Sequence, residues 1–182
     1  AIRDTIHLTP DMDVLDFGCG TGLLTLGLQP YVHSITGADS SPGMLDVLKR
    51  KISDRHFANV KTLYVDIDRG DTLSGSYHLI VSSMTLHHIK DVDALLKQFY
   101  QRLHPSGMLC IADLDEDGGR FHEVNDGVFH FGFNREALSR QFEAAGFQNV
   151  RTLQAAHVEK PIAGGSKHRF TIILTIGTRS SL

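Results

Sequence analysis

The stretch VLDFGCGTG at residues 14–22 decides the fold of this chain. Residues 14–17 form a short, mostly apolar run, which predicts a buried strand, and glycines then occupy every second position to the end of the stretch. Glycine accepts positive φ and lets a ligand approach the backbone closely. The leucine-rich segment 23–28 predicts a buried helix, whose first N–H groups favour an electron-rich or anionic group. The stretch therefore predicts a strand, a tight turn and a helix that suit a nucleotide-like ligand.

The spacing of the glycines separates the classes of nucleotide site. A dinucleotide-binding turn needs the pattern G-x-G-x-x-G, and counting from Gly18 the third glycine falls at position 23, which is Leu23. A phosphate-binding loop of the type G-x-x-x-x-G-K-[ST] is also missing from the sequence. The observed G-x-G-x-G pattern disfavours a nicotinamide oxidoreductase. A tight strand-to-helix corner with no ligand would use the same glycines.

A carboxylate strengthens the case for a ligand. Asp39 follows the predicted strand at 33–38 and stands about twenty residues after the turn, where a carboxylate can accept hydrogen bonds from both ribose hydroxyls of an adenosine. The same carboxylate would repel a 2′-phosphate. The alternative is an ordinary aspartate in the turn at a strand end.

Strand-like runs and amphipathic helices alternate along the chain. We expect strands at 14–17, 33–38, 60–65, 77–83, 108–112, 154–160 and 168–177. Helix-start signals occur at Pro42, Asp91 and Asn134. The alternation predicts an α/β, doubly wound, mostly parallel sheet of seven strands. The last two strands are joined by a short Gly164-Gly165 connection that leaves no room for a crossover helix, so one strand should be antiparallel.

Composition sets further bounds. The 182 residues fit a single domain, 1–182, and the net charge of −3 argues against a general binder of nucleic-acid backbones. The two cysteines, Cys19 and Cys110, form no disulfide framework, and no metal-ligand spacing is visible, so we predict a reducing compartment and no metal site. Neither a signal peptide nor a membrane span is apparent, and we expect a cytoplasmic protein, monomeric or homodimeric.

At this point the motifs resemble a known family. The stretch 14–22 resembles the first motif of class I S-adenosylmethionine-dependent methyltransferases, and the resemblance covers nearly the whole chain. Asp39, the pair Asp66-Ile67, the segment 77–89 and the turn 103–107 match its later motifs. The resemblance implies the Rossmann-like methyltransferase fold and S-adenosyl-L-methionine as cofactor, with S-adenosyl-L-homocysteine as product.

The resemblance also implies cofactor contacts, residue by residue. The expected cofactor-binding residues are Asp16, Gly18 and Gly20 at the methionine part, Asp39 at the ribose, Ser40 and Met44 near the adenosine, Asp66 and Ile67 at the adenine, and Ser82 at the end of strand four. Members of the family usually carry N-terminal helices that close over the cofactor. Here only 1–8 resembles such a helix, so we expect those cap helices to be truncated or absent.

Candidates for catalysis lie beyond the fourth strand. His87 and His88 follow it, where ligands of open α/β sheets bind, and a histidine titrates near neutrality and can act as a base. A structural or capping role is the alternative, because the small-molecule branch of the family often has Leu-His-His at this place whatever its substrate. Methyl transfer itself needs alignment and exclusion of water, and a base only where the acceptor must lose a proton.

The segment 113–133 is rich in aromatic residues and carries two histidines, His122 and His130. It lies where this family often contacts the acceptor, so we expect an apolar wall there and name His130 as a third catalytic candidate. A flap folded onto the core is the alternative. The acidic run 115–117 does not match a calcium loop and is expected to be solvated.

Motifs that are missing from the sequence narrow the class of methyl acceptor. Strand four ends in Ser-Ser-Met-Thr, residues 82–85, without the Asn/Asp-Pro-Pro-aromatic motif of DNA amino-methyltransferases, and the Pro-Cys nucleophile of cytosine C5 enzymes is also missing. We therefore predict a small-molecule acceptor and no nucleic acid, as in the ubiquinone/menaquinone-methyltransferase-like branch. The alternative is a catalytically idle methyltransferase fold that binds S-adenosylmethionine or S-adenosylhomocysteine as a regulatory or scaffolding subunit.

Overall fold

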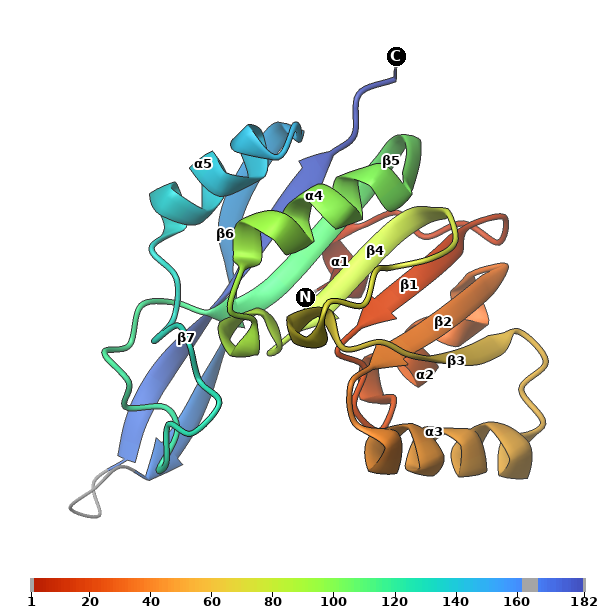
Figure 1. Ribbon diagram of the computed structural model, residues 1–182, viewed down its shortest axis with the longest axis horizontal. Coiled ribbons are helices and arrows are strands. Elements are labelled where there is room, and N and C mark those ends of the chain that lie inside the picture. The colour runs from red at the N-terminus through yellow and green to blue at the C-terminus, as the bar shows by residue number, and fades with distance from the viewer. Residues whose placement is uncertain (1, 162–166, 182) are drawn as a thin grey trace.

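A computed structural model describes residues 2–161 and 167–181 of the chain. Seven strands form one sheet in the order β3-β2-β1-β4-β5-β7-β6 (Figure 1). They are β1 (Asp13–Phe17), β2 (Ser34–Asp39), β3 (Val60–Tyr64), β4 (Tyr77–Ser83), β5 (Leu103–Leu114), β6 (Gln148–Pro161) and β7 (Lys167–Thr178). Strand β7 runs antiparallel to both β5 and β6, and the other pairs are parallel. The predicted fold class is confirmed; Gly164-Gly165 lies outside the described residues.

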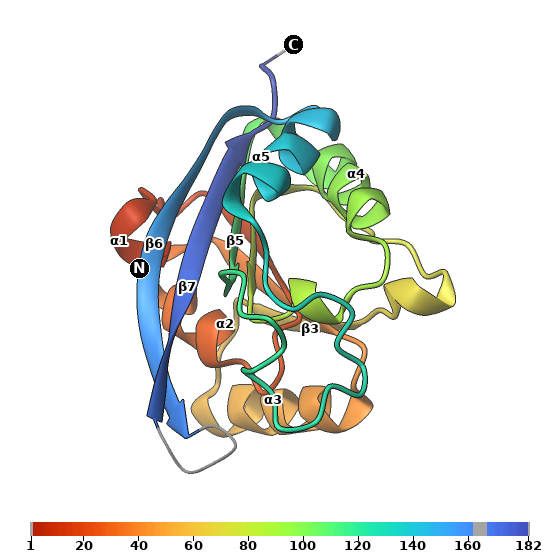
Figure 2. The ribbon, with the colours of Figure 1, turned by 90° about the vertical axis from the view of Figure 1, so that its left-hand side faces the viewer.

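Helices cover both faces of this sheet (Figures 1 and 2). They are α1 (Ile2–Thr5), α2 (Leu23–Leu28), α3 (Pro42–Arg55), α4 (Val92–Arg102) and α5 (Arg135–Ala144), with short 3₁₀ turns η1 (Gln29–Tyr31), η2 (Ile67–Arg69) and η3 (Leu86–His88). Helices α4 and α5 pack on one face, and α1 and α2 on the other. Among the described residues, no helix has the length and apolarity that a membrane crossing needs.

The three predicted helix starts are capped by side chains. Ser41 accepts a hydrogen bond from the backbone N–H of Met44 at 3.4 Å, and Asp91 and Asn134 cap α4 and α5 in the same way at 2.9 and 3.1 Å. Each such cap contributes about 1 kcal/mol to helix stability. The caps fix where α3, α4 and α5 begin.

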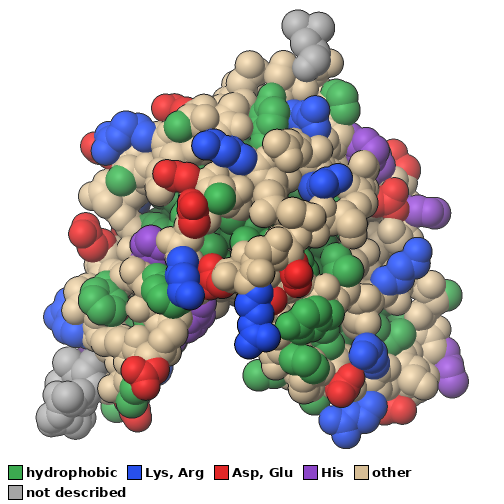
Figure 3. Space-filling model, viewed as in Figure 1, with side chains coloured by type: hydrophobic (Ala, Val, Ile, Leu, Met, Phe, Trp, Pro, Cys, Tyr) green, Lys and Arg blue, Asp and Glu red, His purple; other side chains and the backbone are tan. Residues whose placement is uncertain are grey.

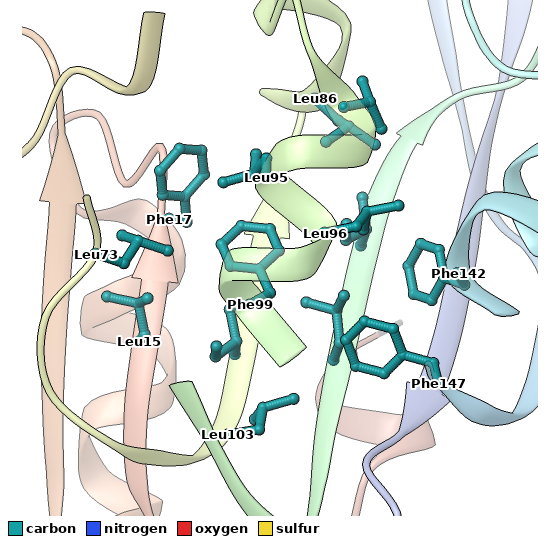
Figure 4. Packing of buried hydrophobic residues seen from close by; sticks show 14 of the residues in the cluster. Leu15, Phe17, Leu73, Leu86, Leu95, Leu96, Phe99, Leu103, Phe142 and Phe147 are labelled. Atoms are coloured by element: carbon teal, nitrogen blue, oxygen red, sulfur yellow. The ribbon is translucent and has the colours of Figure 1, made fainter. Parts of the chain in front are cut away.

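The larger core cluster lies between the sheet and the α4–α5 layer (Figure 4). Phe99 of α4 is fully buried and meets Phe17 edge-to-face, with ring centroids 5.2 Å apart. Phe142 of α5 is also fully buried and belongs to the same cluster. This packing holds Phe17, the last residue of β1, against α4 directly before the glycine-rich turn.

The last three strands are longer than their apolar runs predict. Strand β6 begins at Gln148 and not at residue 154, because it is the edge strand and its first residues are polar, so pairing with β7 leaves no apolar signature. Strand β5 begins at Leu103, which pairs with Tyr77, and the predicted turn at 103–107 lies within it as an irregular stretch with positive φ at Ser106. The outcome is a long β6–β7 hairpin that projects beyond the rest of the sheet (Figure 2).

Candidate functional site

The glycine-rich turn adopts the backbone that its sequence predicts. Gly18, Gly20 and Gly22 all have positive φ, at 70°, 51° and 85°. The N–H groups of Gly18 and Cys19 both donate to the Ala38 carbonyl of β2, at 2.8 and 3.0 Å. The turn is therefore tied to the neighbouring strand, and its open side faces the carboxyl edge of the sheet.

Asp39 holds two loops at once. One carboxylate oxygen accepts from the Gly20 N–H at 2.8 Å, and the other accepts from the Ser41 N–H at 2.8 Å. Each carboxylate oxygen offers a further lone pair, so Asp39 keeps the capacity to accept bonds from a ligand. The residue predicted to bind a ribose also braces the glycine turn.

A cavity of about 400 Å³ opens beside this pair of loops, between α3 and η3. Seven of the nine residues predicted to bind the cofactor line it: Gly18, Gly20, Asp39, Ser40, Met44, Asp66 and Ile67. His88 and Thr85 also line it, on the side away from α3. Figure 3 shows the molecule hollowed between the α3 part and the part that carries the hairpin. We refer to the cavity of about 400 Å³ as the glycine-turn cavity.

A second cavity of about 710 Å³ lies on the other side of the turn, against α2 and the β6–β7 hairpin. Its walls are mostly apolar and include Leu24, Phe121 and Ile172. Gly18 and Met84 line both cavities. We refer to this second cavity, of about 710 Å³, as the hairpin cavity. The two cavities therefore meet where β1 and β4 end.

Met84 adopts an uncommon backbone conformation at that junction. Its φ is 56°, in the left-handed region, and its N–H donates to the Ala112 carbonyl of β5 at 2.8 Å. A bulky residue with positive φ is strained, and such strain concentrates at functional positions. The sequence pattern gave no sign of this feature.

Asp16 lines the hairpin cavity with a nearly buried carboxyl group, which accepts from the Thr25 hydroxyl at 2.6 Å. Burial raises the pKa of Asp16 to about 6, and the Thr25 hydrogen bond opposes the rise. Ser82 is buried and donates to the Phe17 carbonyl at 2.9 Å, and it is not among the described residues that line either cavity. Its neighbours Ser83 and Met84 take that place.

The three catalytic candidates occupy three different environments. His87 is buried, and its Nδ1 lies 2.6 Å from Asp113 Oδ1. His88 faces the glycine-turn cavity, and its Nδ1 donates to the Gly127 carbonyl at 2.7 Å. His130 donates from Nε2 to the Ile89 carbonyl at 2.9 Å and is not among the described residues of either cavity. The structure brings the rings of His87 and His88 together, whereas the His130 ring bonds to the Ile89 carbonyl.

Two residues join the histidines without having been assigned a role from the sequence. His122 Nε2 lies 3.1 Å from His87 Nε2. Burial, with His87, His88 and Lys160 nearby, lowers the pKa of His122, and Asp117 acts in the opposite direction. Asp113 is fully buried and also accepts from the backbone N–H groups of Thr85 and Leu86. The sequence signals were that Asp113 follows the predicted strand 108–112 and that His122 lies in the aromatic segment.

The aromatic segment is both a wall and a flap. Phe121 lines the hairpin cavity, while Phe133 is buried in the core cluster. Phe129 and Phe131 are about half exposed, at 46% and 49%. The backbone N–H groups of Phe129 and His130 donate to the His87 carbonyl at 2.9 and 3.2 Å, which fastens the segment to η3. The two alternatives drawn from the sequence thus apply to different residues.

Comparison with known proteins assigns the family. A family model described as a methyltransferase domain matches residues 2–152. An uncharacterized methyltransferase of Schizosaccharomyces pombe is 34% identical over 160 residues, which is 80% of this chain and 56% of that protein. A malonyl-[acyl-carrier protein] O-methyltransferase of Priestia megaterium is 29% identical over 128 residues, 69% of this chain and 44% of that protein. The chain thus spans about half the length of these two relatives.

Solved structures share the fold at low sequence identity. The YcgJ protein of Bacillus subtilis superposes with a TM-score of 0.82 at 15% identity, covering 98% of this chain and 96% of that one. A phosphoethanolamine N-methyltransferase of Haemonchus contortus, solved with S-adenosyl-L-methionine, gives a TM-score of 0.78 at 15% identity, covering 98% and 51% of the two chains. The chain belongs to the methyltransferase domain family and has the fold of the class I S-adenosylmethionine-dependent enzymes.

Proposed function

We propose that this chain transfers a methyl group from S-adenosylmethionine to a small-molecule acceptor. The observation that carries the proposal is the meeting of two cavities at Gly18 and Met84, one beside the glycine turn and one apolar. Methyl transfer needs a cofactor site and an acceptor site that share one boundary, because the methyl carbon must face the acceptor in line with the breaking bond.

In this proposal the cofactor occupies the glycine-turn cavity. The ribose hydroxyls donate to Asp39, with Ser40 and Met44 beside the adenosine, and Asp66 and Ile67 flank the adenine. The methionine part crosses Gly18 and Gly20, where the missing side chains permit close approach. Its ammonium group would reach past Gly18, where the two cavities meet, to Asp16 in the wall of the hairpin cavity, and the buried carboxyl group would gain a cation from this contact. Ser82 acts through the Phe17 carbonyl and not by contact.

The acceptor occupies the hairpin cavity. Leu24, Phe121 and Ile172 offer it an apolar surface, and a volume of about 710 Å³ is in the range of small-molecule sites. An apolar small molecule fits these walls better than a polymer with a charged backbone, and the net charge of −3 agrees with that. The narrower resemblance to the ubiquinone/menaquinone branch stays a prediction.

The reaction asks little of the protein. S-adenosylmethionine carries an activated sulfonium, so the residues align the acceptor and exclude water while the methyl group moves and S-adenosylhomocysteine forms. Where the acceptor must lose a proton, His88 is the proposed base for an acceptor group that reaches past Met84 into the glycine-turn cavity, which His88 lines. The Nδ1–H of His88 is bound to the Gly127 carbonyl, which leaves Nε2 to accept. His87 and His130 are positioning residues that hold η3 and the aromatic segment.

Release of S-adenosylhomocysteine tests the proposal. The purified chain is incubated with S-adenosylmethionine and a panel of apolar alcohols, phenols, acids and amines, and the product is measured with and without each acceptor. Acceptor-dependent release that Asp39→Ala lowers at limiting S-adenosylmethionine and that Asp46→Ala preserves supports the proposal, since Asp46 is an exposed residue of α3 paired with Lys49. Cofactor binding without release for any acceptor would favour the idle, scaffolding alternative.

A further inference from the structure

Three histidines from two distant segments converge beside the glycine-turn cavity. His87 and His88 belong to η3, and His122 belongs to the aromatic segment. One ring nitrogen from each lies within 4.8 Å of the others. The ring centroids of His87 and His88 are 4.1 Å apart, and His122 lies 5.1 and 5.4 Å from them. Sequence spacing predicted no metal site here, because the fold and not a local motif assembles the cluster.

The outward nitrogens of the two η3 histidines are fixed by acceptors. The Nδ1 of His87 donates a hydrogen bond to Asp113 Oδ1 at 2.6 Å, and the Nδ1 of His88 donates to the Gly127 carbonyl at 2.7 Å. An acceptor at Nδ1 keeps the proton there, so each Nε2 keeps a free lone pair, and that of His87 lies next to His122. Metal-binding histidines in proteins are held in this manner by a carboxylate or a backbone carbonyl.

Asp113 is itself firmly held. It is fully buried, and its oxygens accept from the N–H groups of Leu86 and Leu114 at 2.8 and 2.7 Å. Among the described residues, His87 is the side chain that hydrogen-bonds to it. A buried carboxylate is costly without a nearby positive charge, and a cation on the far nitrogen of His87 would supply one through the ring.

The inward nitrogens have the separation of ligand atoms. The Nε2 atoms of His87 and His122 are 3.1 Å apart. Nitrogens at 2.0–2.1 Å from a tetrahedral ion lie about 3.3 Å from each other. The limit of 4.8 Å for the whole set means that closing the site needs a convergence of at most about 1.5 Å, within the reach of small side-chain rotations.

We propose that His87, His88 and His122 form a binding site for a divalent transition-metal ion, Zn²⁺ in the first instance. Three imidazoles are a donor set that suits Zn²⁺, Ni²⁺ and Co²⁺ and does not suit Mg²⁺ or Ca²⁺, which prefer oxygen. His88 lines the glycine-turn cavity, so a fourth position faces that space. The ion joins η3 to the aromatic segment. Its binding requires neither cofactor nor methyl transfer, so it is tested independently of the proposed function, and an ion on His88 Nε2 would take that atom from its proposed role as a base.

Direct metal titration tests the site. The chain is stripped with a chelator, exchanged into buffer, and titrated with ZnCl₂ by calorimetry, with CoCl₂ followed in parallel by its visible ligand-field absorption. We expect one ion per chain with a dissociation constant of about 10 µM or tighter. We also expect a rise in the unfolding temperature with Zn²⁺ and none with Mg²⁺.

Variants locate the ion. His122→Gln should weaken Zn²⁺ binding by at least about 30-fold, and Asp113→Asn, which leaves the ligands in place, by about 10–100-fold. His33→Gln is the matched control, since His33 is exposed and does not belong to the cluster, and this variant should bind Zn²⁺ like the parent chain. Because His122 lies on a loop, its variant stays interpretable even where Asp113→Asn fails to fold. No binding by the folded parent chain, or equal binding by His122→Gln, overturns the proposal and leaves a hydrogen-bonded histidine pair.

Discussion

The two sides of the cavity system are built on different principles. The glycine-turn side comes from the loops after β1, β2 and β3, each only a few residues long and each marked by glycine, aspartate or a helix cap. The hairpin side comes from α2, the aromatic segment and the long β6–β7 hairpin, which meet only in the folded chain. Local backbone requirements shape the first side, and long-range packing shapes the second. Substitutions at matched positions on the two sides should separate these principles.

The largest effect should come from the turn. In Gly18→Ala, the added Cβ overlaps the Thr85 side chain and the residue must keep a φ of 70°, so we expect a loss of about 3–5 kcal/mol in the free energy of unfolding. Gly20→Ala has the same kind of φ but open space, so about 1–2 kcal/mol is expected. Urea unfolding measures both. Equal losses in the two variants would show that Thr85 yields and that the turn is not tightly packed.

The aromatic segment should divide in the same way. Phe133→Ala removes a buried ring from the core cluster and should cost about 3 kcal/mol of unfolding free energy. Phe129→Ala, in the same segment but 46% exposed, should change it by less than about 0.5 kcal/mol. A comparable loss in Phe129→Ala would mean that this ring anchors the segment, contrary to its position.

Asp39 links the turn to its ligand. Asp39→Ala strands the ribose hydroxyls and frees the Gly20 N–H, so S-adenosylmethionine binding should weaken by about 1–3 kcal/mol. Calorimetry on this variant and on Asp46→Ala measures the difference. Unchanged affinity in Asp39→Ala would count heavily against the proposed ribose contact.

The smallest effect should appear as a pH dependence at Asp16. Its pKa of about 6 in the free chain means that the carboxyl group is protonated below that pH, whereas pairing with the cofactor's ammonium group requires the ionised form. Affinity for S-adenosylmethionine should therefore be greatest above pH 6 and fall by at most tenfold for each unit below, about 1.4 kcal/mol per unit.

Asp16→Asn is the control for this titration. Its side chain does not ionise, so the affinity of this variant should be weak and flat across the same pH range. An equally flat pH profile for the parent chain would show that the cofactor's ammonium group does not pair with Asp16.

The same contrast explains what the sequence could predict. Helix caps and apolar periods are local, and they placed the sheet and its antiparallel strand. The resemblance to the family, carried by the glycine turn and the later motifs, supplied seven of the residues that line the glycine-turn cavity. The extent of β6 escaped prediction because an edge strand with polar residues such as Gln148 and Arg151 has no apolar run. The strained Met84 and the His87–His122 contact escaped because they depend on β5 and on a segment distant in sequence.

Parallel calorimetric titration of the chain with S-adenosylmethionine, S-adenosylhomocysteine and NAD tests the central claim most directly. The account predicts micromolar binding of the first two and none of NAD, because the turn has Leu23 where a dinucleotide site needs glycine. Binding of NAD alone, or of none of the three by a chain shown to be folded, would contradict it.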